Sequence, residues 1–202
     1  MSGSKAMAEF EARDGRRVLL RPLALRDIES CLVFANTLVK ERRVNLDIGV
    51  VSFERRVTRK EEMRFLRTIV REVAGKNAVS ISAFVGWKLV GNCDVRRRKT
   101  KDEHHCGVLG IAILDGYRGV GIGERMMAEA LARARAVGIW LVELSVFANN
   151  AVAVHLYEKM GFLRAGLIPG KILRGERSYD EITMYVDLRG SDISTQGRRR
   201  KS

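Results

Sequence analysis

Residues 107–123 read GVLGIAILDGYRGVGIG, and this stretch decides the fold. Its first half, from Gly107 to Leu114, is an apolar run of strand length. Its second half is rich in glycine. Apolar side chains then recur at helical spacing from Glu124 to Val137, and Gly138 is suited to end that helix. The sequence therefore predicts a strand, a glycine loop and a helix in succession.

The glycine loop from Arg118 to Gly123 is suited to hold an anion. Glycines let the backbone turn tightly, and the positive end of the following helix lies at the same place. Arg118 can add a bidentate contact to a phosphate. A P-loop would need a Gly-Lys-Ser/Thr motif that this stretch lacks, and in the dinucleotide fingerprint the third glycine comes one residue later. A tight turn without a ligand is the remaining alternative.

Regular patterns continue on both sides of this unit. Thr58-Arg59-Lys60-Glu61 predicts a helix-capping box, and Gly86-Trp87-Lys88 predicts a hairpin turn. We expect strands at 18–20, 79–87, 89–95, 139–147, 163–168 and 182–188, and helices at 25–43, 58–73 and 150–160. The order predicts an α/β (α+β) domain with one mixed, largely antiparallel sheet and helices on both faces.

Two blocks of this sequence resemble signature motifs of the GNAT superfamily of N-acetyltransferases. Arg118 to Gly123 follows the pattern Arg-x-x-Gly-x-Gly after an apolar strand. Asn150 to Phe162 is similar to the family's helix, Asn-x-x-Ala-x-x-x-Tyr-x-x-x-Gly-Phe. Tyr179 to Tyr185 resembles the last strand of many members, so the resemblance covers residues 16–188.

The resemblance implies a splayed central strand pair that binds acetyl-CoA. The backbone of Ile111, Ala112 and Ile113 is expected to pair with the pantetheine arm. The pyrophosphate is expected to be held by Arg118, Gly119, Val120, Gly121, Ile122 and Gly123. Asn150 is expected to lie near the pantetheine or to cap the second helix, for which asparagine is well suited. The implied reaction moves the acetyl group to a primary amine by direct attack in a ternary complex.

Two residues are the candidates for the proton chemistry. By resemblance, Tyr157 donates to the coenzyme A sulfur, although it is also placed to pack on the sheet. Many N-terminal acetyltransferases of the superfamily have a glutamate or histidine where this chain has Ser145. Glu143 lies one pleat away on the same face, so it is the candidate base, acting through water. An ion-paired or solvated carboxylate is the alternative for Glu143.

Other titratable residues precede the glycine loop. Glu103, His104 and His105 lie just upstream of the position where other members carry a glutamate. Two adjacent histidines face opposite sides of a strand, so at most one can face the site. Their spacing to Cys93 and Cys106 matches no zinc pattern, and we expect no metal.

Composition sets the boundaries and the location. The 202 residues favour one domain, at 16–188, with a flexible leader at 1–15 and a disordered basic tail at 189–202. Three unpatterned cysteines predict a reducing, cytoplasmic location. No apolar run approaches the roughly 20 residues that span a bilayer. Many charges beside a single glutamine weakly indicate a thermophilic source.

The net charge of +13 is suited to acidic partners. If the protein is an enzyme, the acceptor amine belongs to a protein lysine, a protein N-terminus or a small molecule. The basic region at 25–76 disfavours polycations unless Glu54, Glu61 and Glu62 line the site. A non-catalytic module that senses acetyl-CoA or associates with nucleic acid is the alternative, and a homodimer is compatible with either.

Overall fold

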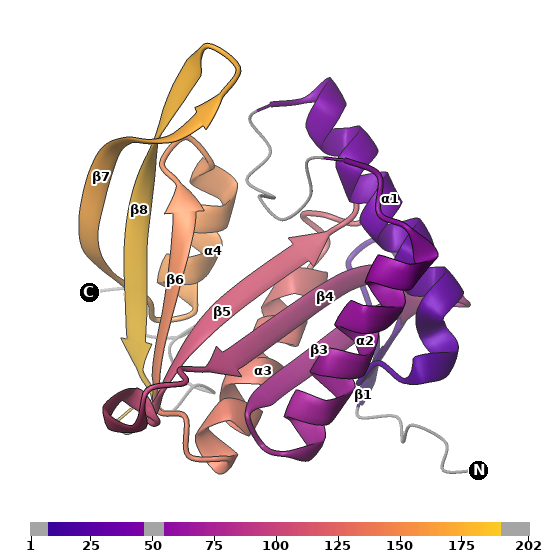
Figure 1. Cartoon of the computed structure of the whole chain (residues 1–202), viewed down its shortest axis with the longest axis horizontal. Helices are drawn as coiled ribbons and strands as arrows, with labels where there is room; N and C mark the ends of the chain where they lie inside the picture. The colour runs from indigo at the N-terminus through magenta and orange to yellow at the C-terminus, as the bar shows by residue number, and fades with distance from the viewer. Residues whose placement is uncertain (1–7, 47–54, 191–202) are drawn as a thin grey trace.

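The computed structural model describes residues 8–46 and 55–190. Its centre is one eight-stranded sheet in the order β1-β2-β3-β4-β5-β6-β8-β7 (Figure 1). The strands are β1 (Ala8–Glu11), β2 (Arg17–Arg21), β3 (Ala78–Val85), β4 (Lys88–Arg97), β5 (Cys106–Ile113), β6 (Leu141–Phe147), β7 (Leu163–Arg174) and β8 (Arg177–Asp187). Neighbouring strands are antiparallel except β5 and β6, which are parallel. The expected mixed, largely antiparallel sheet is confirmed.

Helices cover both faces of the sheet, as expected. The four helices are α1 (Ile28–Val44), α2 (Arg59–Ala74), α3 (Ile122–Ala136) and α4 (Ala151–Lys159). Helices α1 and α2 lie together on one face, and α3 lies on the other with α4 beside β6 (Figure 1). Strand β3 is buried along nearly its whole length because α2 and α3 sandwich it.

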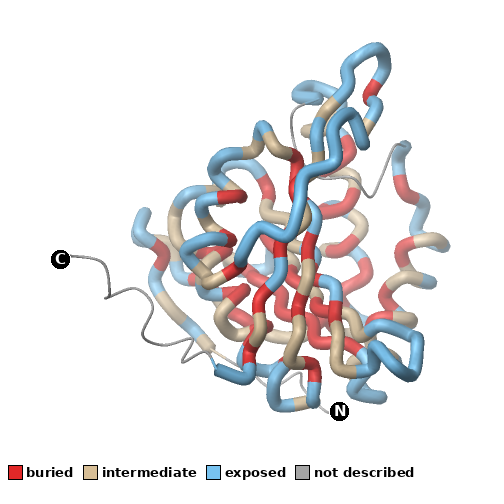
Figure 2. The backbone as a smooth tube through the Cα atoms, turned by 90° about the vertical axis from the view of Figure 1, so that its left-hand side faces the viewer, coloured by how far each residue is buried: buried red, intermediate tan, exposed pale blue. Residues whose placement is uncertain are grey.

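Each face has its own apolar core. Met126 and Leu131 of α3 pack with β3, β4 and β6 in the larger core, while Phe34 of α1 and Leu66 of α2 belong to the smaller core. Figure 2 shows the buried stretches concentrated between the helices and the central strands, whereas β7 is exposed along most of its length. The sheet is therefore covered where β3 to β6 lie and open at its β7 edge.

Helix α2 begins at the predicted capping box. Thr58 Oγ1 accepts from the Glu61 backbone N–H at 3.3 Å, and the Thr58 backbone N–H donates to Glu61 Oε2 at 2.8 Å. These bonds satisfy two backbone donors that a helix start otherwise leaves free. Gly75 ends the helix, so both predicted boundaries are confirmed.

The structure corrects three expectations. Residues 8–15 are not a flexible leader, since β1 pairs with β2 and Ala12 is buried. Strand β4 extends to Arg97, past the expected end at Val95. Strand β7 continues to Arg174, well past the expected end at Ile168. Residues 1–7 and the tail at 191–202 lie outside the described residues, as does Glu54. No helix in the described ranges is both long and apolar enough to cross a membrane.

Candidate functional site

The central feature of the site is the gap between β5 and β6. These strands pair only from Cys106 with Leu141 to Val108 with Glu143. Beyond Val108, β5 stays paired to β4 on one side, and no described strand pairs with its other edge. Ile111, Ala112 and Ile113 lie on this part of β5, so their backbone forms an edge that no described strand pairs with, which we call the gap. The expected splay is confirmed.

The glycine loop follows directly at the open end of β5. Gly119 and Gly121 have φ angles of 75° and 92°, which glycine adopts without the strain that a Cβ atom imposes. Gly121 is the N-cap of α3, and no side chain in the described part of the protein caps this helix. The first N–H groups of α3 are therefore available to an anion, with the helix dipole behind them.

Gly123 allows α3 to approach the strand closely. A Cβ atom at this position would lie 3.0 Å from Ile113 Cδ1 and 3.3 Å from Leu156 Cδ2. Any larger residue would push the start of α3 away from β5 and α4. Gly123 thus places the helix N-terminus against the same strand whose free edge borders the gap.

Arg118 is placed differently from the expected phosphate contact. Its Nε donates to the Ile113 carbonyl oxygen at 2.8 Å, and its Nη2 is ion-paired with Glu41 of α1. Glu41 also accepts from the Asp115 backbone N–H at 2.9 Å. In this arrangement the guanidinium joins the loop to α1.

Arg13, which sequence reasoning assigned to the leader, lies against the loop. Its backbone N–H donates to the Val120 carbonyl at 3.0 Å, and its side chain lies 3.8 Å from a Cβ built on Gly121. The guanidinium is 67% exposed and lies 3.6 Å from Glu124. The alternation of Ala8, Phe10 and Ala12 with charged residues was the missed signal for β1, which brings Arg13 here.

Asn150 and Tyr157 lie on α4, at the α3 side of the sheet. Asn150 Oδ1 accepts from the Ala153 backbone N–H at 3.1 Å, so it is the N-cap of this helix. Tyr157 is 7% exposed and packs on Phe162 with ring centroids 5.9 Å apart. Burial, with a smaller contribution from Cys93 on β4, raises the pKa of the Tyr157 hydroxyl well above 10. The phenol therefore stays protonated at neutral pH, so it can donate its proton but does not act as a base.

Glu143 is the last β6 residue that pairs with β5. Its neighbours Val142 and Leu144 face the larger core, so Glu143 and Ser145 face the side of α1 and α2. Glu143 accepts from Arg98 Nε at 2.6 Å and its side chain is 33% exposed, which agrees with the alternative of an ion-paired carboxylate. The ion pair makes Glu143 a weaker candidate base.

The two histidines lie away from the open part of the gap. His104 is exposed, and His105 stacks on Trp140 with ring centroids 4.1 Å apart. The His105 carbonyl accepts from the backbone N–H groups of Trp140 and Leu141, at the end where β5 and β6 are still paired. The fold therefore does not bring either histidine to the splay.

Sequence reasoning missed Asp94, the carboxylate closest in register to the splay. It lies on β4 opposite Gly110, just past the last β5–β6 pair. Its side chain is 14% exposed, and its Oδ1 is buried without a hydrogen-bond partner. Burial raises the pKa of Asp94 above 3.8, although Ser80, Asn92 and Arg96 partly offset this effect.

Asp94 faces the same side as α1 and α2. Its neighbours Cys93 and Val95 point into the larger core, so Asp94 points the other way. Burial raises the pKa of Cys31 on α1 to about 12, and the carboxylates of Glu62, Asp27 and Asp94 contribute to this shift. The signal in the sequence was the alternation of Asn92, Asp94 and Arg96 with apolar residues, which marks a polar strand face.

The β7–β8 hairpin lies at the open end of the gap, near the end of α1. Arg174, at the end of β7, is buried and donates to the Leu46 carbonyl just beyond α1. Its guanidinium lies 4.5 Å from the ring centroid of Phe147 at the end of β6, and Phe147 packs on Tyr179 at 5.4 Å. The hairpin and α1 thus stand on either side of the open end of the gap (Figure 1).

The model of the acetyltransferase (GNAT) family matches residues 48–162, more than half of the chain. The chain belongs to the GNAT family. The splayed strands and the glycine loop are thus those of a GNAT domain, and the resemblance of the two sequence blocks is confirmed.

Comparisons with other proteins agree with this assignment. Streptothricin acetyltransferase from Streptomyces lavendulae is 36% identical over 39% of this chain and 41% of its own length. The N-alpha-acetyltransferase RimI from Mycobacterium tuberculosis is 34% identical over 48% of this chain and 60% of its own. This GNAT chain thus spans about half the length of these relatives. YncA from Salmonella typhimurium, solved with its cofactor acetyl-CoA, has the same fold at a TM-score of 0.72 and 15% identity, covering 87% of this chain and 96% of YncA.

Proposed function

We propose that this protein transfers the acetyl group of acetyl-CoA to a primary amine by direct attack in a ternary complex. The observation that carries the proposal is the position of the uncapped N-terminus of α3 beside the free edge of β5. One ligand that has both an extended polar arm and a diphosphate fits these two features together. Acetyl-CoA is such a ligand, and YncA of the same fold was solved with it.

Three parts of the chain would hold acetyl-CoA. The backbone of Ile111, Ala112 and Ile113 would pair with the pantetheine arm along the free edge of β5. The N–H groups of Gly119 to Gly123 would bind the pyrophosphate, and the exposed guanidinium of Arg13 would add a positive charge. Arg118 would hold the loop in shape through Glu41 instead of contacting the phosphate.

The acceptor amine would enter from the side of α1 and α2, opposite Tyr157. Asp94 is the proposed base, because a raised pKa makes a carboxylate a better proton acceptor near neutral pH. It takes a proton from the amine, directly or through one water, as the nitrogen attacks the thioester carbon. The carbon–sulfur bond then breaks, and the protonated Tyr157 gives its proton to the thiolate and regains one from solvent. Glu143 is the second candidate base, because it faces the same side.

The acceptor is a primary amine of a protein lysine, a protein N-terminus or a small molecule. The two relatives illustrate the range, since one is named a streptothricin acetyltransferase and the other an N-alpha-acetyltransferase. Glu62 does not line the entrance, because it is buried beneath α2, and Glu61 is bound by Arg55 and Thr58. Asp94 and Glu143, which face this side of the sheet near the splay, are the carboxylates that we propose attract the amine.

The test combines acetyl-CoA binding with thiol release. Wild type is expected to bind acetyl-CoA in calorimetry and to release coenzyme A with at least one amine of a broad panel. Gly121→Asp places a carboxylate in the anion site and is expected to abolish both. Gly138→Asp is the matched control, because Gly138 has a similar φ of 83° and nothing within 4 Å of an added Cβ. Its strain and charge change are the same, but it lies at the other end of α3.

Two outcomes would count against the proposal. If wild type does not bind acetyl-CoA, the glycine loop and β5 do not form an acetyl-CoA site and the proposal fails. If it binds acetyl-CoA but no amine causes thiol release, the alternative of a non-catalytic acetyl-CoA sensor is favoured. A cytoplasmic location is part of the proposal, supported by the three free thiols, of which Cys31 and Cys93 are buried.

A further inference from the structure

The exposed face of α2 carries a regular row of positive charges. Lys60, Arg64, Arg67 and Arg71 follow one another at spacings of four, three and four residues, so they lie on one side of the helix. All four are exposed, and with Met63 and Thr68 they line a shallow groove along α2. We call these four residues the α2 basic row.

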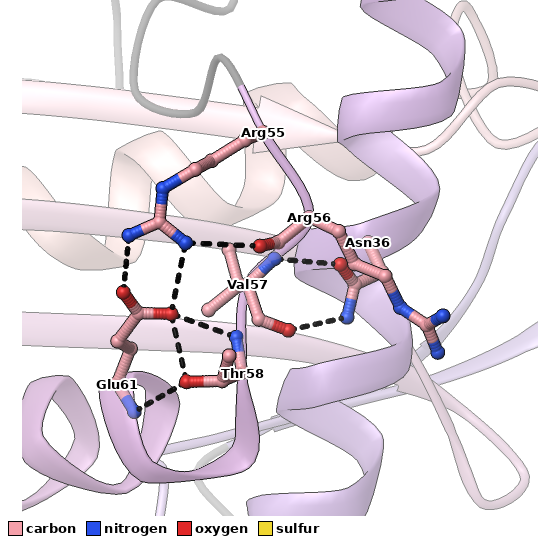
Figure 3. A network of polar contacts seen from close by, with 6 residues as sticks. All are labelled: Asn36, Arg55, Arg56, Val57, Thr58 and Glu61. Carbon is pink, nitrogen blue, oxygen red and sulfur yellow. Dashed lines mark hydrogen bonds and ion pairs between the residues drawn. The ribbon is translucent and has the colours of Figure 1, made fainter.

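The acidic residues of α2 do not neutralise this row. Glu61 is bound to Thr58 and to Arg55 at the start of the helix, where Asn36 of α1 also binds the backbone of Val57 (Figure 3). Glu62 is buried under the helix. Glu72 is turned toward Arg96 of β4, at 3.8 Å.

Arg59 also lines the groove but is not part of the α2 basic row. Arg59 is ion-paired with Glu29 of α1 at 2.8 Å. Within residues 8–46 and 55–190, none of the four row residues has an ion pair or a side-chain hydrogen bond. Four uncompensated charges therefore face solvent from one rigid helix, which is fixed to α1 and to the sheet at the other side.

The length of the row matches a stretch of phosphates. Eleven residues at about 1.5 Å per residue separate its ends by roughly 16 Å. Phosphates of one nucleic-acid strand are spaced by about 3.4 Å along the duplex axis, so the row can reach several of them. Three of the four residues are arginines, whose planar guanidinium binds phosphate oxygens in pairs.

A membrane surface and unpaired nucleic-acid bases fit this face less well. An amphipathic helix that binds a membrane inserts an apolar face, but Leu66 and Ile69 of α2 are buried against the protein. The aromatic ring of α2, Phe65, is half-buried beneath Arg96 and cannot stack on bases. This face therefore offers charge contacts and neither apolar insertion nor aromatic stacking.

From these observations we propose that the α2 basic row binds the phosphate backbone of nucleic acid without reading its sequence. This proposal does not depend on acetyl transfer, because no row residue belongs to the acetyl-CoA site. Its consequence for an acetyltransferase would be to hold the enzyme near acceptors that are themselves bound to nucleic acid.

The test measures fluorescence anisotropy of a labelled 20-bp RNA duplex, and of the DNA duplex of the same sequence, over a range of salt concentrations. Each phosphate contact contributes about −0.9 to the slope of log K against log salt on duplex DNA, so the row is expected to supply roughly −3.6. The variant K60Q/R64Q/R67Q/R71Q is expected to lose that part of the slope and to bind at least about tenfold more weakly at low salt. Binding is expected to be equal for unrelated sequences.

The control variant removes the same number of positive charges, four, from exposed positions outside α2. Arg17, Lys99, Lys101 and Arg177 are exposed and have no partner among the described residues, and they are not aligned. The variant R17Q/K99Q/K101Q/R177Q is expected to keep most of the affinity and the slope. An equal loss in this control would mean that net charge alone attracts the duplex, and the proposal would fail.

Other results would also overturn the proposal. They are the absence of wild-type binding at low salt, unchanged binding by the row variant, and equally salt-dependent binding to polyglutamate or to vesicles of phosphatidylcholine and phosphatidylserine (3:1). Unfolding midpoints establish that each variant is folded, and R64Q/R67Q replaces the fourfold variant if that one is not. Thiol release is measured separately, so a failure of acetyl transfer does not affect this result.

Discussion

Arg118 of the glycine loop is ion-paired with Glu41, near the C-terminal end of α1. The pair connects the loop that precedes α3 with a helix on the other face of the sheet. Glu41 is mostly buried, and its second oxygen accepts from the Asp115 backbone N–H. The loop is thus bound by a residue 77 positions before Arg118 in the chain, and this coupling is open to measurement.

Replacing Glu41 by glutamine is expected to weaken both the fold and acetyl-CoA binding. The variant removes the charge that holds Arg118, so the loop backbone becomes less well ordered for the pyrophosphate. A double-mutant cycle with Arg118→Met is expected to give a coupling of about 1 kcal/mol, as residues in direct contact do. Calorimetric unfolding and acetyl-CoA titration provide the two free energies. Strictly additive effects would show that the ion pair contributes nothing to the loop.

Tyr157→Phe is expected to lower kcat by about a hundredfold or more while the KM for acetyl-CoA changes little. The phenyl ring keeps its packing on Phe162, so the unfolding midpoint is expected to stay close to that of wild type. Because the pKa of Tyr157 is raised, its deprotonation is not expected to reduce activity below about pH 10. Steady-state kinetics across pH provides the check. The control is Tyr185→Phe on β8, a more exposed tyrosine that is expected to leave kcat unchanged.

Asp94→Asn is expected to make the protein more stable at neutral pH and less active. Burial raises the pKa of Asp94 above 3.8, so at intermediate pH the folded protein holds a proton that the unfolded chain has released. Wild-type stability therefore falls as pH rises from about 3.8 through the raised pKa, and the cost is complete above it. Asparagine removes this cost, so the gain in unfolding midpoint is expected at pH 7 and is expected to vanish below pH ~3.8.

The pH dependence of activity tests the role of Asp94 independently of its effect on stability. Wild-type kcat is expected to fall as pH decreases through the raised pKa, and Asp94→Asn is expected to lack this acid limb and have a low kcat throughout. Glu62→Gln is the matched control, because burial also raises the pKa of Glu62 and its Oε2 is also without a partner. Glu62 belongs to α2 and not to the strands of the splay, so its replacement is expected to alter stability alone. A normal pH profile in Asp94→Asn would transfer the role of base to Glu143.

Thr58→Ala is expected to destabilise the protein by about 1 kcal/mol, because the helix start loses its capping hydroxyl. For a domain of this size, that corresponds to a fall of roughly 2–4 °C in the unfolding midpoint. Thr68→Ala in the middle of the same helix is expected to have the opposite sign, since alanine has the higher helix propensity. Thermal unfolding of the two variants separates the capping effect from propensity. Equal changes would argue against the capping box as a source of stability.

Local patterns in the sequence determined much of this protein. The strand, glycine loop and helix at 107–137 depend on nearest neighbours along the chain, because glycine conformation, apolar spacing and helix caps act over a few residues. The same holds for the capping box at Thr58, the N-cap at Asn150 and the turn at Gly86. These elements, with the second family block, were sufficient to indicate the fold and the gap.

Tertiary structure alone decided which side chains meet at the gap. Glu143 is ion-paired with Arg98, which lies 45 residues away, and Arg118 is ion-paired with Glu41 on α1. The register of β4 with β5 places Asp94 opposite Gly110. The pairing of β1 with β2 brings Arg13 to the glycine loop. Ion pairing and burial depend on distances between residues that are remote in sequence. A local pattern contains no record of those distances, so it names the candidate residues but does not decide among them.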